Sequence, residues 1–153
     1  MAPDLWRFSL ELYAKPGVEP ACLALQANGE SVCLLLCGLW LEQRGVACDE
    51  HRLKHLRQVA APWDSEVVQP LRRLRNQWKT RALGDAPLRH LREQVKQLEL
   101  EAERQLLERL EAAAKDWPGG HKEAAQWLTG LAVNTGPANH DALHELRVAI
   151  SSI

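Results

Sequence analysis

The stretch from Val32 to Leu41, VCLLLCGLWL, carries no charged side chain. Ser31 before it and Gly45 after it are residues that often begin and end α-helices, so we expect one helix from Val32 to Arg44. A helix that is apolar nearly all round must be covered on every side. The stretch has about half of the roughly 20 residues that a membrane span needs. We therefore expect this helix to be the buried centre of a folded core.

The rest of the chain has the composition of a helical protein. Of its 153 residues, 46% are hydrophobic and 25% are charged, as in ordinary globular domains. Good helix formers are abundant, whereas aromatic residues make up only 5%, with one Tyr and one Phe. No window alternates between apolar and polar residues as a half-buried strand would. The sequence predicts an all-α, single-domain bundle of about six to eight helices.

Caps and helix breakers divide the first half of the chain into segments. Asp4 should cap a first helix that ends near Ala14, with two stripes that together form a broad buried face: Leu5, Phe8 and Leu12, and Trp6, Leu10 and Tyr13. A second helix should end at Gly29, and Asp49 should cap a fourth. We expect Ala61-Pro62 to break that fourth helix, and a longer helix, kinked at Pro70, to follow as far as Leu83.

The second half of the chain contains the longest predicted helix, at about 86–116. Asp85 should cap it and Trp117-Pro118-Gly119-Gly120 should end it. Its apolar residues recur every 3.6 residues on average rather than in strict heptads, which favours one arm of a helical hairpin over a parallel zipper. Two shorter helices, at roughly 121–133 and 140–150, should complete the domain. We expect residues 4–83 to supply the core and residues 85–151 the long helix and the C-terminal helices.

The net charge of −1 gives no global field that would attract nucleic acid or an acidic membrane. The start of the chain is amphipathic and lacks the basic region and cleavage site of a secretory signal, so its cysteines should be reduced thiols. These features predict a cytoplasmic protein that does not enter a membrane.

A local excess of cations lies within the longer helix after Trp63. Arg72, Arg75 and Lys79 are spaced along one flank, with Arg73 and Arg81 nearby. Such a stripe could bind the phosphates of nucleic acid or another polyanion, because Arg presents a planar fork to anionic oxygens. It could also bind an acidic protein, or be solvated or paired within the molecule to acidic residues of the long helix, namely Glu99, Glu101, Glu103 and Glu108.

Cys48, His51 and His55 have a spacing compatible with zinc, because both imidazoles fall on one helical face. No fourth ligand lies nearby in the sequence. His140 and His144 form a second pair, so a site that joins both pairs is conceivable, and two solvated His pairs are the alternative. Three further thiols, those of Cys22, Cys33 and Cys37, lie in apolar segments and should pack in the core.

The chain contains six Trp residues but only one Phe and one Tyr. Trp6, Trp40, Trp63 and Trp78 fall at apolar periodic positions and should belong to the core. Trp117 lies beside a Pro-Gly-Gly turn. It could be exposed as part of an interface, or it could pack against the end of the long helix.

Several segments together resemble a family of uncharacterised, all-helical proteobacterial proteins, a domain of unknown function. The segments are Trp6, YAKPGV (13–18), ACL (21–23), Leu25-Gln26, VCLLL (32–36), Leu39-Trp40-Leu41, Trp63, Val67-Val68, Pro70-Leu71-Arg72, Leu74-Arg75 and Trp78-Lys79. The resemblance covers about the first half to two-thirds of the chain. It implies an all-helical fold and a bacterial origin, and it implies no activity.

No catalytic motif stands out: a Gly-rich phosphate loop, a nucleophile elbow and a His-Glu-x-x-His zinc motif are all absent from the sequence. This shifts the expectation from catalysis towards binding. We expect a small helical adaptor or regulator that acts on another protein, without catalytic activity and without a cofactor. The alternatives are polyanion or nucleic-acid binding through the Arg72/Arg75/Lys79 stripe, and a metal-dependent or redox enzyme that uses Cys48, His51 and His55.

Overall fold

The computed structural model describes residues 4–121, 126–133 and 136–152, and every regular element in this part of the chain is helical. The α-helices are α1 (Leu5–Tyr13), α2 (Val18–Ala27), α3 (Val32–Arg44), α4 (Glu50–Trp63), α5 (Gln69–Gln77), α6 (Ala86–Ala114), α7 (Trp127–Leu131) and α8 (Pro137–Ile150). A π-helical turn, η1 (Asp64–Val68), and a 3-10 turn, η2 (Arg81–Gly84), complete them. The predicted all-α class is confirmed. None of these helices is long and apolar enough to cross a membrane.

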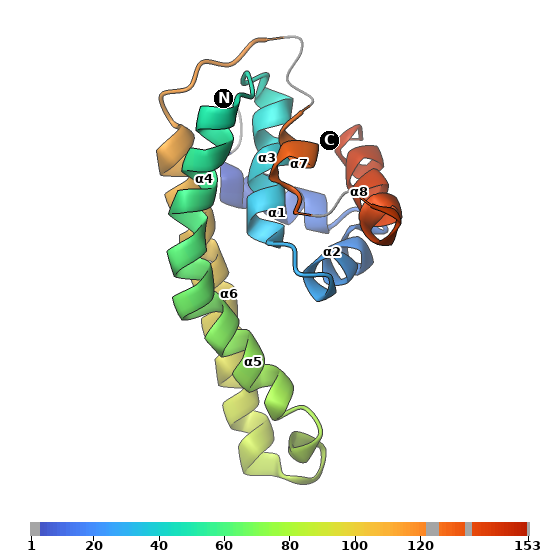
Figure 1. Ribbon diagram of the computed structural model, residues 1–153. Helices are drawn as coiled ribbons and strands as arrows, with labels where there is room; N and C mark the ends of the chain where they lie inside the picture. The colour runs from blue at the N-terminus through green and yellow to red at the C-terminus, as the bar shows by residue number, and fades with distance from the viewer. Residues whose placement is uncertain (1–3, 122–125, 134–135, 153) are drawn as a thin grey trace.

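The molecule consists of a body and a projecting arm (Figure 1). The body contains α1, α2, α3, α7 and α8, together with the parts of α4 and α6 that lie beside them. The arm is a helical hairpin in which α4, η1 and α5 run outward and α6 returns, and its far end lies well away from the body. The hairpin predicted for the long helix is thereby confirmed.

The third helix is the centre of the core, as its sequence predicts. Every residue from Cys33 to Leu41 is buried, and Leu35, Leu36 and Leu39 are no more than 3% exposed. The side chain of Ser31 caps this helix by accepting a hydrogen bond from the backbone N–H of Leu34. Helices α1, α6 and α7 all pack against it, and together they cover the run from Cys33 to Leu41 on every side.

Two buried or nearly buried carboxylates tie the C-terminal helices to the body. Glu42 of α3 accepts hydrogen bonds from the backbone N–H of Leu128, at 2.7 Å, and from the guanidinium of Arg147. Glu30, only 3% exposed, accepts from the backbone N–H of Val133 at 2.7 Å and from the amide of Asn139. Such charge-assisted bonds are about twice as strong as neutral ones. They hold α7 and α8 against α3 and α2.

The predicted break at Pro62 is wrong. Helix α4 continues through Pro62 to Trp63 and passes into η1, where the backbone N–H of Gln69 bonds to the carbonyl of Asp64, five residues back. Pro70 follows at the start of α5. In a regular α-helix the ring of Pro70 would collide with the carbonyl four residues earlier. The wider π turn before Pro70 relieves this collision. The outward half of the hairpin is therefore continuous.

Other boundaries differ from the predictions by a few residues. The helix predicted to reach Leu83 ends at Gln77 and is followed by η2. Helix α6 begins after Asp85, whose carboxylate caps it as predicted, and ends at Ala114. Of the segment predicted to be helical at 121–133, residues 127–131 form α7, and residues 122–125 lie outside the described part of the chain. Helix α8 begins at Pro137 rather than His140.

The prediction that both stripes of α1 are buried is wrong for one stripe. Leu5, Phe8 and Leu12 are buried as expected. Leu10 is 53% exposed, Tyr13 is 40% exposed, and Trp6 is half-buried. The second stripe lines a hollow beside the arm, and the guanidinium of Arg104 on α6 lies 5.1 Å from the centroid of the Trp6 ring.

Candidate functional site

The hollow beside α1 is an open cavity of about 250 Å³ at the junction of the arm and the body. Its apolar walls come from both parts of the molecule. The body contributes the exposed stripe of α1 and the start of α3, and the arm contributes η1, α5 and one flank of α6. The lining side chains are Trp6, Ser9, Leu10, Tyr13, Gln26, Ser31, Val32, Cys33, Leu36, Asp64, Val68, Arg72, Leu100, Glu103 and Leu107.

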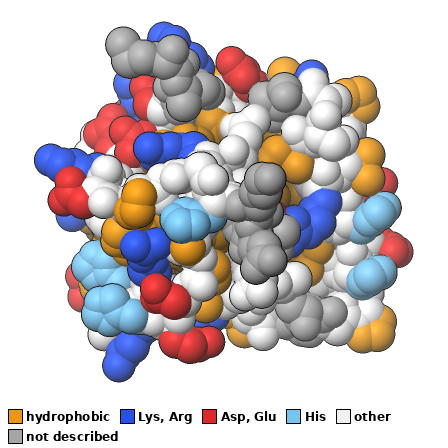
Figure 2. Space-filling model, turned by 90° about the horizontal axis from the view of Figure 1, so that it is seen from above, with side chains coloured by type: hydrophobic (Ala, Val, Ile, Leu, Met, Phe, Trp, Pro, Cys, Tyr) orange, Lys and Arg blue, Asp and Glu red, His pale blue; other side chains and the backbone are white. Residues whose placement is uncertain are grey.

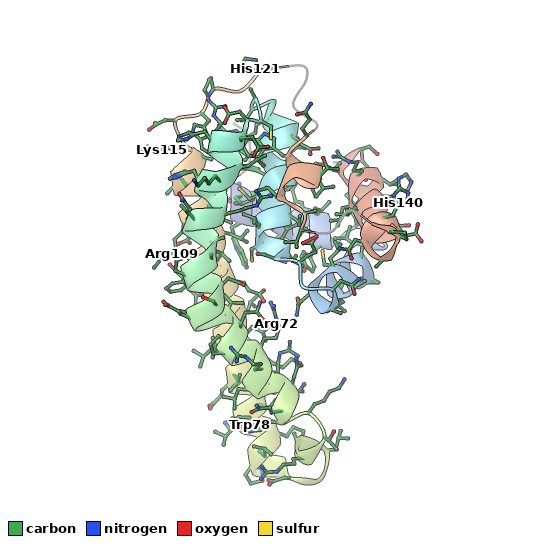
Figure 3. The ribbon with its side chains drawn as sticks, viewed as in Figure 1. Arg72, Trp78, Arg109, Lys115, His121 and His140 are labelled. Atoms are coloured by element: carbon green, nitrogen blue, oxygen red, sulfur yellow. The ribbon has the colours of Figure 1, made fainter. Side chains whose placement is uncertain are left out.

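Helical periodicity brings the cavity residues of each element to one face. Leu100, Glu103 and Leu107 are spaced three and four apart on α6, so they lie on one flank of that helix. Asp64 and Val68 are the two ends of η1, and π turns are frequent at functional sites. The arm leaves the body at this level, where Arg72 points into the space between them (Figure 3).

Two arginines and two glutamates form a network at the polar side of the cavity. Arg72 of α5 bonds to Glu99 through Nε at 3.1 Å, and to Glu103 through its Nη2 at 3.2 Å. Arg75 bonds to the same Glu99. The Glu99 side chain is only 7% exposed, whereas those of Arg72 and Arg75 are 14% and 20% exposed. This network fastens α5 to α6.

The two carboxylates of this network are shifted in opposite directions. Burial alone would raise the pKa of Glu99, but the hydrogen bonds and charges of Arg75 and Arg72 outweigh it and lower that pKa below its usual range. Burial also raises the pKa of Glu103, and there the single bond from Arg72 does not compensate, with the neighbouring Glu99 charge adding to the rise. Glu99 is thus a well-compensated anion, while Glu103 lacks sufficient counter-charge.

We expect Glu99→Gln to reduce the free energy of unfolding at pH 7 by about 2–3 kcal/mol. This is somewhat less than the roughly 3–5 kcal/mol of a fully buried pair, because both arginines keep partial access to water. Since folding lowers the pKa of Glu99, its contribution is present above the ordinary Glu pKa and is lost as pH falls through the folded value. The difference between the wild type and the variant should therefore shrink in acid.

Urea unfolding at pH 7 and at several values below pH 4 measures this effect. Glu101→Gln, on the exposed side of the same helix, is the matched control and should change stability by less than about 0.5 kcal/mol. Equal losses for Glu99→Gln and Glu101→Gln at pH 7 would contradict the role of the network.

The thiols close to the cavity are not activated as nucleophiles. Burial raises the pKa of Cys22 to about 11, and it raises the pKa values of Cys33 and Cys37 as well. A raised pKa keeps a thiol protonated, and the thiolate is the reactive form. Cys22, Cys33 and Cys37 are buried in the core, as their apolar segments predict.

The cations of the predicted stripe divide into two groups. Arg72 and Arg75 belong to the network with Glu99 and Glu103, which is the intramolecular pairing that the sequence left open. Arg73, Lys79 and Arg81 are exposed, and within the described part of the chain they make no salt bridge. They lie on the outer arm, the region in which Trp78 is labelled in Figure 3.

The residues of the predicted metal site lie at the start of α4. His51 and His55 are exposed, and Cys48 is half-buried with a pKa raised by burial and by nearby acidic residues. The described residues contain no group of three or more His, Cys, Asp or Glu side chains placed to hold a metal ion. Figure 2 shows imidazoles at opposite sides of the face seen from above, rather than in one cluster. The zinc site stays a prediction without a geometric counterpart in this part of the chain.

Trp117 is half-buried and stacks on Trp127, with ring centroids 5.7 Å apart. Its ring also contacts His55 edge-on, at 6.2 Å, and the guanidinium of Arg52 lies 5.0 Å from its centroid. It packs against the core after the end of α6. Of the four tryptophans predicted to be in the core, Trp40 is buried, while Trp6, Trp63 and Trp78 are half-buried.

The cavity itself was not predicted from the sequence. Its apolar lining includes Leu10, which periodicity assigns to the buried face of the first helix, and Leu100, which lies outside the main apolar stripe of the long helix. The sequence does show one signal of the cavity, which is an excess of apolar surface on two helices. The helix α1 has two apolar stripes, and α6 carries Leu100 and Leu107 on a different flank from Val95 and Ala102. A helix with more apolar surface than one neighbour can cover often lines a binding site.

A family model described as "Protein of unknown function (DUF2390)" matches residues 4–110. This range contains α1 to α5, nearly all of α6, the cavity and the arm. No curated protein and no solved structure matches the chain. Because the family model covers more than half of the 153 residues, the chain belongs to the DUF2390 family of proteins of unknown function.

Proposed function

We propose that this protein is a protein-interaction adaptor without catalytic activity, and that the outer end of its arm binds an acidic surface of another protein. The arm end is defined here as residues 73–91, which comprise most of α5, the turn η2 and the first residues of α6. The observation that carries the proposal is the combination of exposed leucines and exposed cations on this projection.

The apolar component of the arm end is Leu83, which is 78% exposed, and Leu91, which is 48% exposed. Leu98, two turns further along α6 from Leu91, is 57% exposed and continues the same flank. A single exposed leucine is normal on a protein surface. Three of them on a thin hairpin that projects from the body provide apolar area that a partner could bury.

The charged component consists of the exposed side chains of Arg73, Lys79, Arg81 and Arg89. Within the described residues these four make no salt bridge. The carboxylate of Asp85, also in this segment, caps α6 by accepting from the backbone N–H of Leu88 at 3.1 Å. The arm end is therefore locally cationic on a chain of net charge −1, which favours an acidic partner by charge complementarity.

The leucines favour a protein over a nucleic acid as the partner. Nucleic-acid interfaces are polar and wet, and their affinity comes mainly from neutralised phosphates. Leu83, the most exposed of the arm's leucines, has no role in such an interface unless it wedges between bases. A protein partner can bury the leucines and pair with the surrounding cations at the same time.

Photo-crosslinking tests this proposal by capturing the partner covalently inside the cell. A benzophenone amino acid replaces Leu83 in the cells that make the protein, and adducts are identified by mass spectrometry after nuclease treatment. The matched control places the same group at Leu23, which is 57% exposed on α2 of the body. We expect a specific protein adduct at Leu83 that is absent at Leu23.

The identified protein is then purified and its affinity for the chain is measured at low and high salt. Lys79→Glu with Arg81→Glu should weaken binding at least about tenfold at low salt, and Leu83→Asp should weaken it at both salts. Arg7→Glu with Lys54→Glu, two exposed cations of the body region, should have little effect. Unchanged affinity of the arm-end variants would refute the proposal, as would an adduct and a steep salt dependence with nucleic acid alone.

A further inference from the structure

We propose that the cavity between the arm and the body binds a small apolar molecule that carries one protonated amine. This site is separate from the arm end, since it is formed by α1, α3, η1 and the middle of α6. Nothing in the proposed adaptor function requires it.

The size and lining of the cavity fit a small organic molecule. A volume of about 250 Å³ exceeds the roughly 150 Å³ of an engineered cavity that holds benzene, and it lies just below the usual range for ligand pockets. The inner wall is formed by Leu36 and Val68, both almost fully buried. One ring with a short side chain would fill such a space.

The rim of the cavity presents apolar surface to water. Leu10 is 53% exposed and Leu100 is 48% exposed, and the two line the cavity from α1 and α6. Covering apolar area is favourable roughly in proportion to the area removed from water. A ligand that covers both leucines would gain binding free energy from each of them.

The charge of the lining selects an amine over a carboxylate. Asp64 and Glu103 line the cavity, and Arg72 is its one described cation. Arg72 also bonds to Glu99, which lies outside the cavity, so its charge is shared between two carboxylates. The anions of the lining are therefore under-compensated, and a ligand ammonium would supply the missing charge.

Glu103 is the group best placed to accept the amine. One of its oxygens bonds to Arg72, and within the described residues the other oxygen accepts no hydrogen bond. Among those residues no buried side-chain oxygen lacks a partner, so this second oxygen is reachable from solvent. Its pKa, which burial raises, is consistent with an anion that lacks counter-charge. Tyr13 at the rim adds an aromatic ring, a favourable neighbour for an ammonium group.

Three probes of nearly the same shape test the proposal: 2-phenylethylamine, ethylbenzene and 3-phenylpropionate. Titrations followed by NMR of the ¹⁵N-labelled chain report both the affinity and the residues that respond. We expect the amine to bind with a Kd on the order of 0.1–1 mM and to shift residues of α1, η1 and the middle of α6. Ethylbenzene should bind several-fold more weakly, and the carboxylate should bind weakest.

Two sets of variants separate charge from apolar contact. Glu103→Gln should weaken binding of the amine about tenfold without changing the affinity for ethylbenzene. If Glu103→Gln disturbs the fold, Asp64→Asn replaces it and should also weaken binding of the amine. Leu10→Ala with Leu100→Ala should weaken all the probes alike. Glu101→Gln, on the exposed face of α6, is the control and should change nothing. Equal affinity for the amine and ethylbenzene, no response at the cavity, or an amine affinity that survives both carboxylate variants would overturn the proposal.

Discussion

Trp127→Ala should lower the free energy of unfolding by about 3–5 kcal/mol, the usual cost of removing a buried tryptophan. The side chain is completely buried, and its indole N–H donates to the carbonyl of Val46 at 2.7 Å. Its ring also stacks on Trp117. Truncation would leave a large void and an unpaired carbonyl, and it would detach α7 from α3.

Urea unfolding, followed by circular dichroism, measures this loss. Trp127→Phe keeps an aromatic ring but removes the indole N–H, and it should cost roughly 1–3 kcal/mol. Leu23→Ala, at an exposed position of α2, is the control and should lie within about 0.5 kcal/mol of the wild type. If Trp127→Ala were as stable as Leu23→Ala, α7 would not be an integral part of the core.

Leu36→Ala should cost about 2–5 kcal/mol, because Leu36 is 3% exposed in the middle of the central helix. The side chain also forms part of the cavity wall, so its removal enlarges a space that is already present. Leu39, fully buried and not in contact with the cavity, is the matched comparison. Leu39→Ala should cost at least as much, since its void is fully enclosed.

Thermal and urea unfolding of both variants measure this difference. A loss below about 0.5 kcal/mol for Leu36→Ala and Leu39→Ala would contradict the central position of α3. Leu91→Ala, at a 48% exposed position of the arm, shows the effect of the same change without burial.

The features that sequence predicts well here are those set by local chemistry. Asp4, Ser31, Asp49 and Asp85 all cap helices, because a side-chain oxygen at that position satisfies a backbone N–H of the first turn. The central position of α3 follows from its uniformly apolar surface. Each of these conclusions depends on residues close together in the chain.

The features that sequence predicts poorly depend on distant neighbours. The prediction at Pro62 failed because α6 supports the helix from the side: the indole N–H of Trp63 donates to the carbonyl of Ala102 on α6, at 2.8 Å. Leu10 belongs to a periodic apolar stripe, yet no helix covers it. Periodicity identifies a face that can be buried, but only the tertiary arrangement decides whether a neighbour buries it.

The candidate site also combines features that follow from local sequence with features that depend on distant neighbours. The stripe of cations was evident from spacing, and so was the acidic side of α6. Which of the two arginines paired with which glutamate required the hairpin geometry, since Arg72 and Glu99 are 27 residues apart. Predicting the cavity would require the tertiary arrangement of still more elements, because its walls come from α1, α3, η1 and α6 together.

The π-helical turn η1 constrains how chain length in this family can change. A π turn holds one residue more than the α turn that would otherwise occupy its place. Deleting a residue such as Ser65 would leave a regular α turn, which brings the ring of Pro70 against the carbonyl four residues earlier. A deletion in the segment from Trp78 to Asp85 would leave this turn unchanged and would alter the arm end instead. A relative that lacks one residue within Asp64–Val68 should therefore also lack a proline at the position of Pro70.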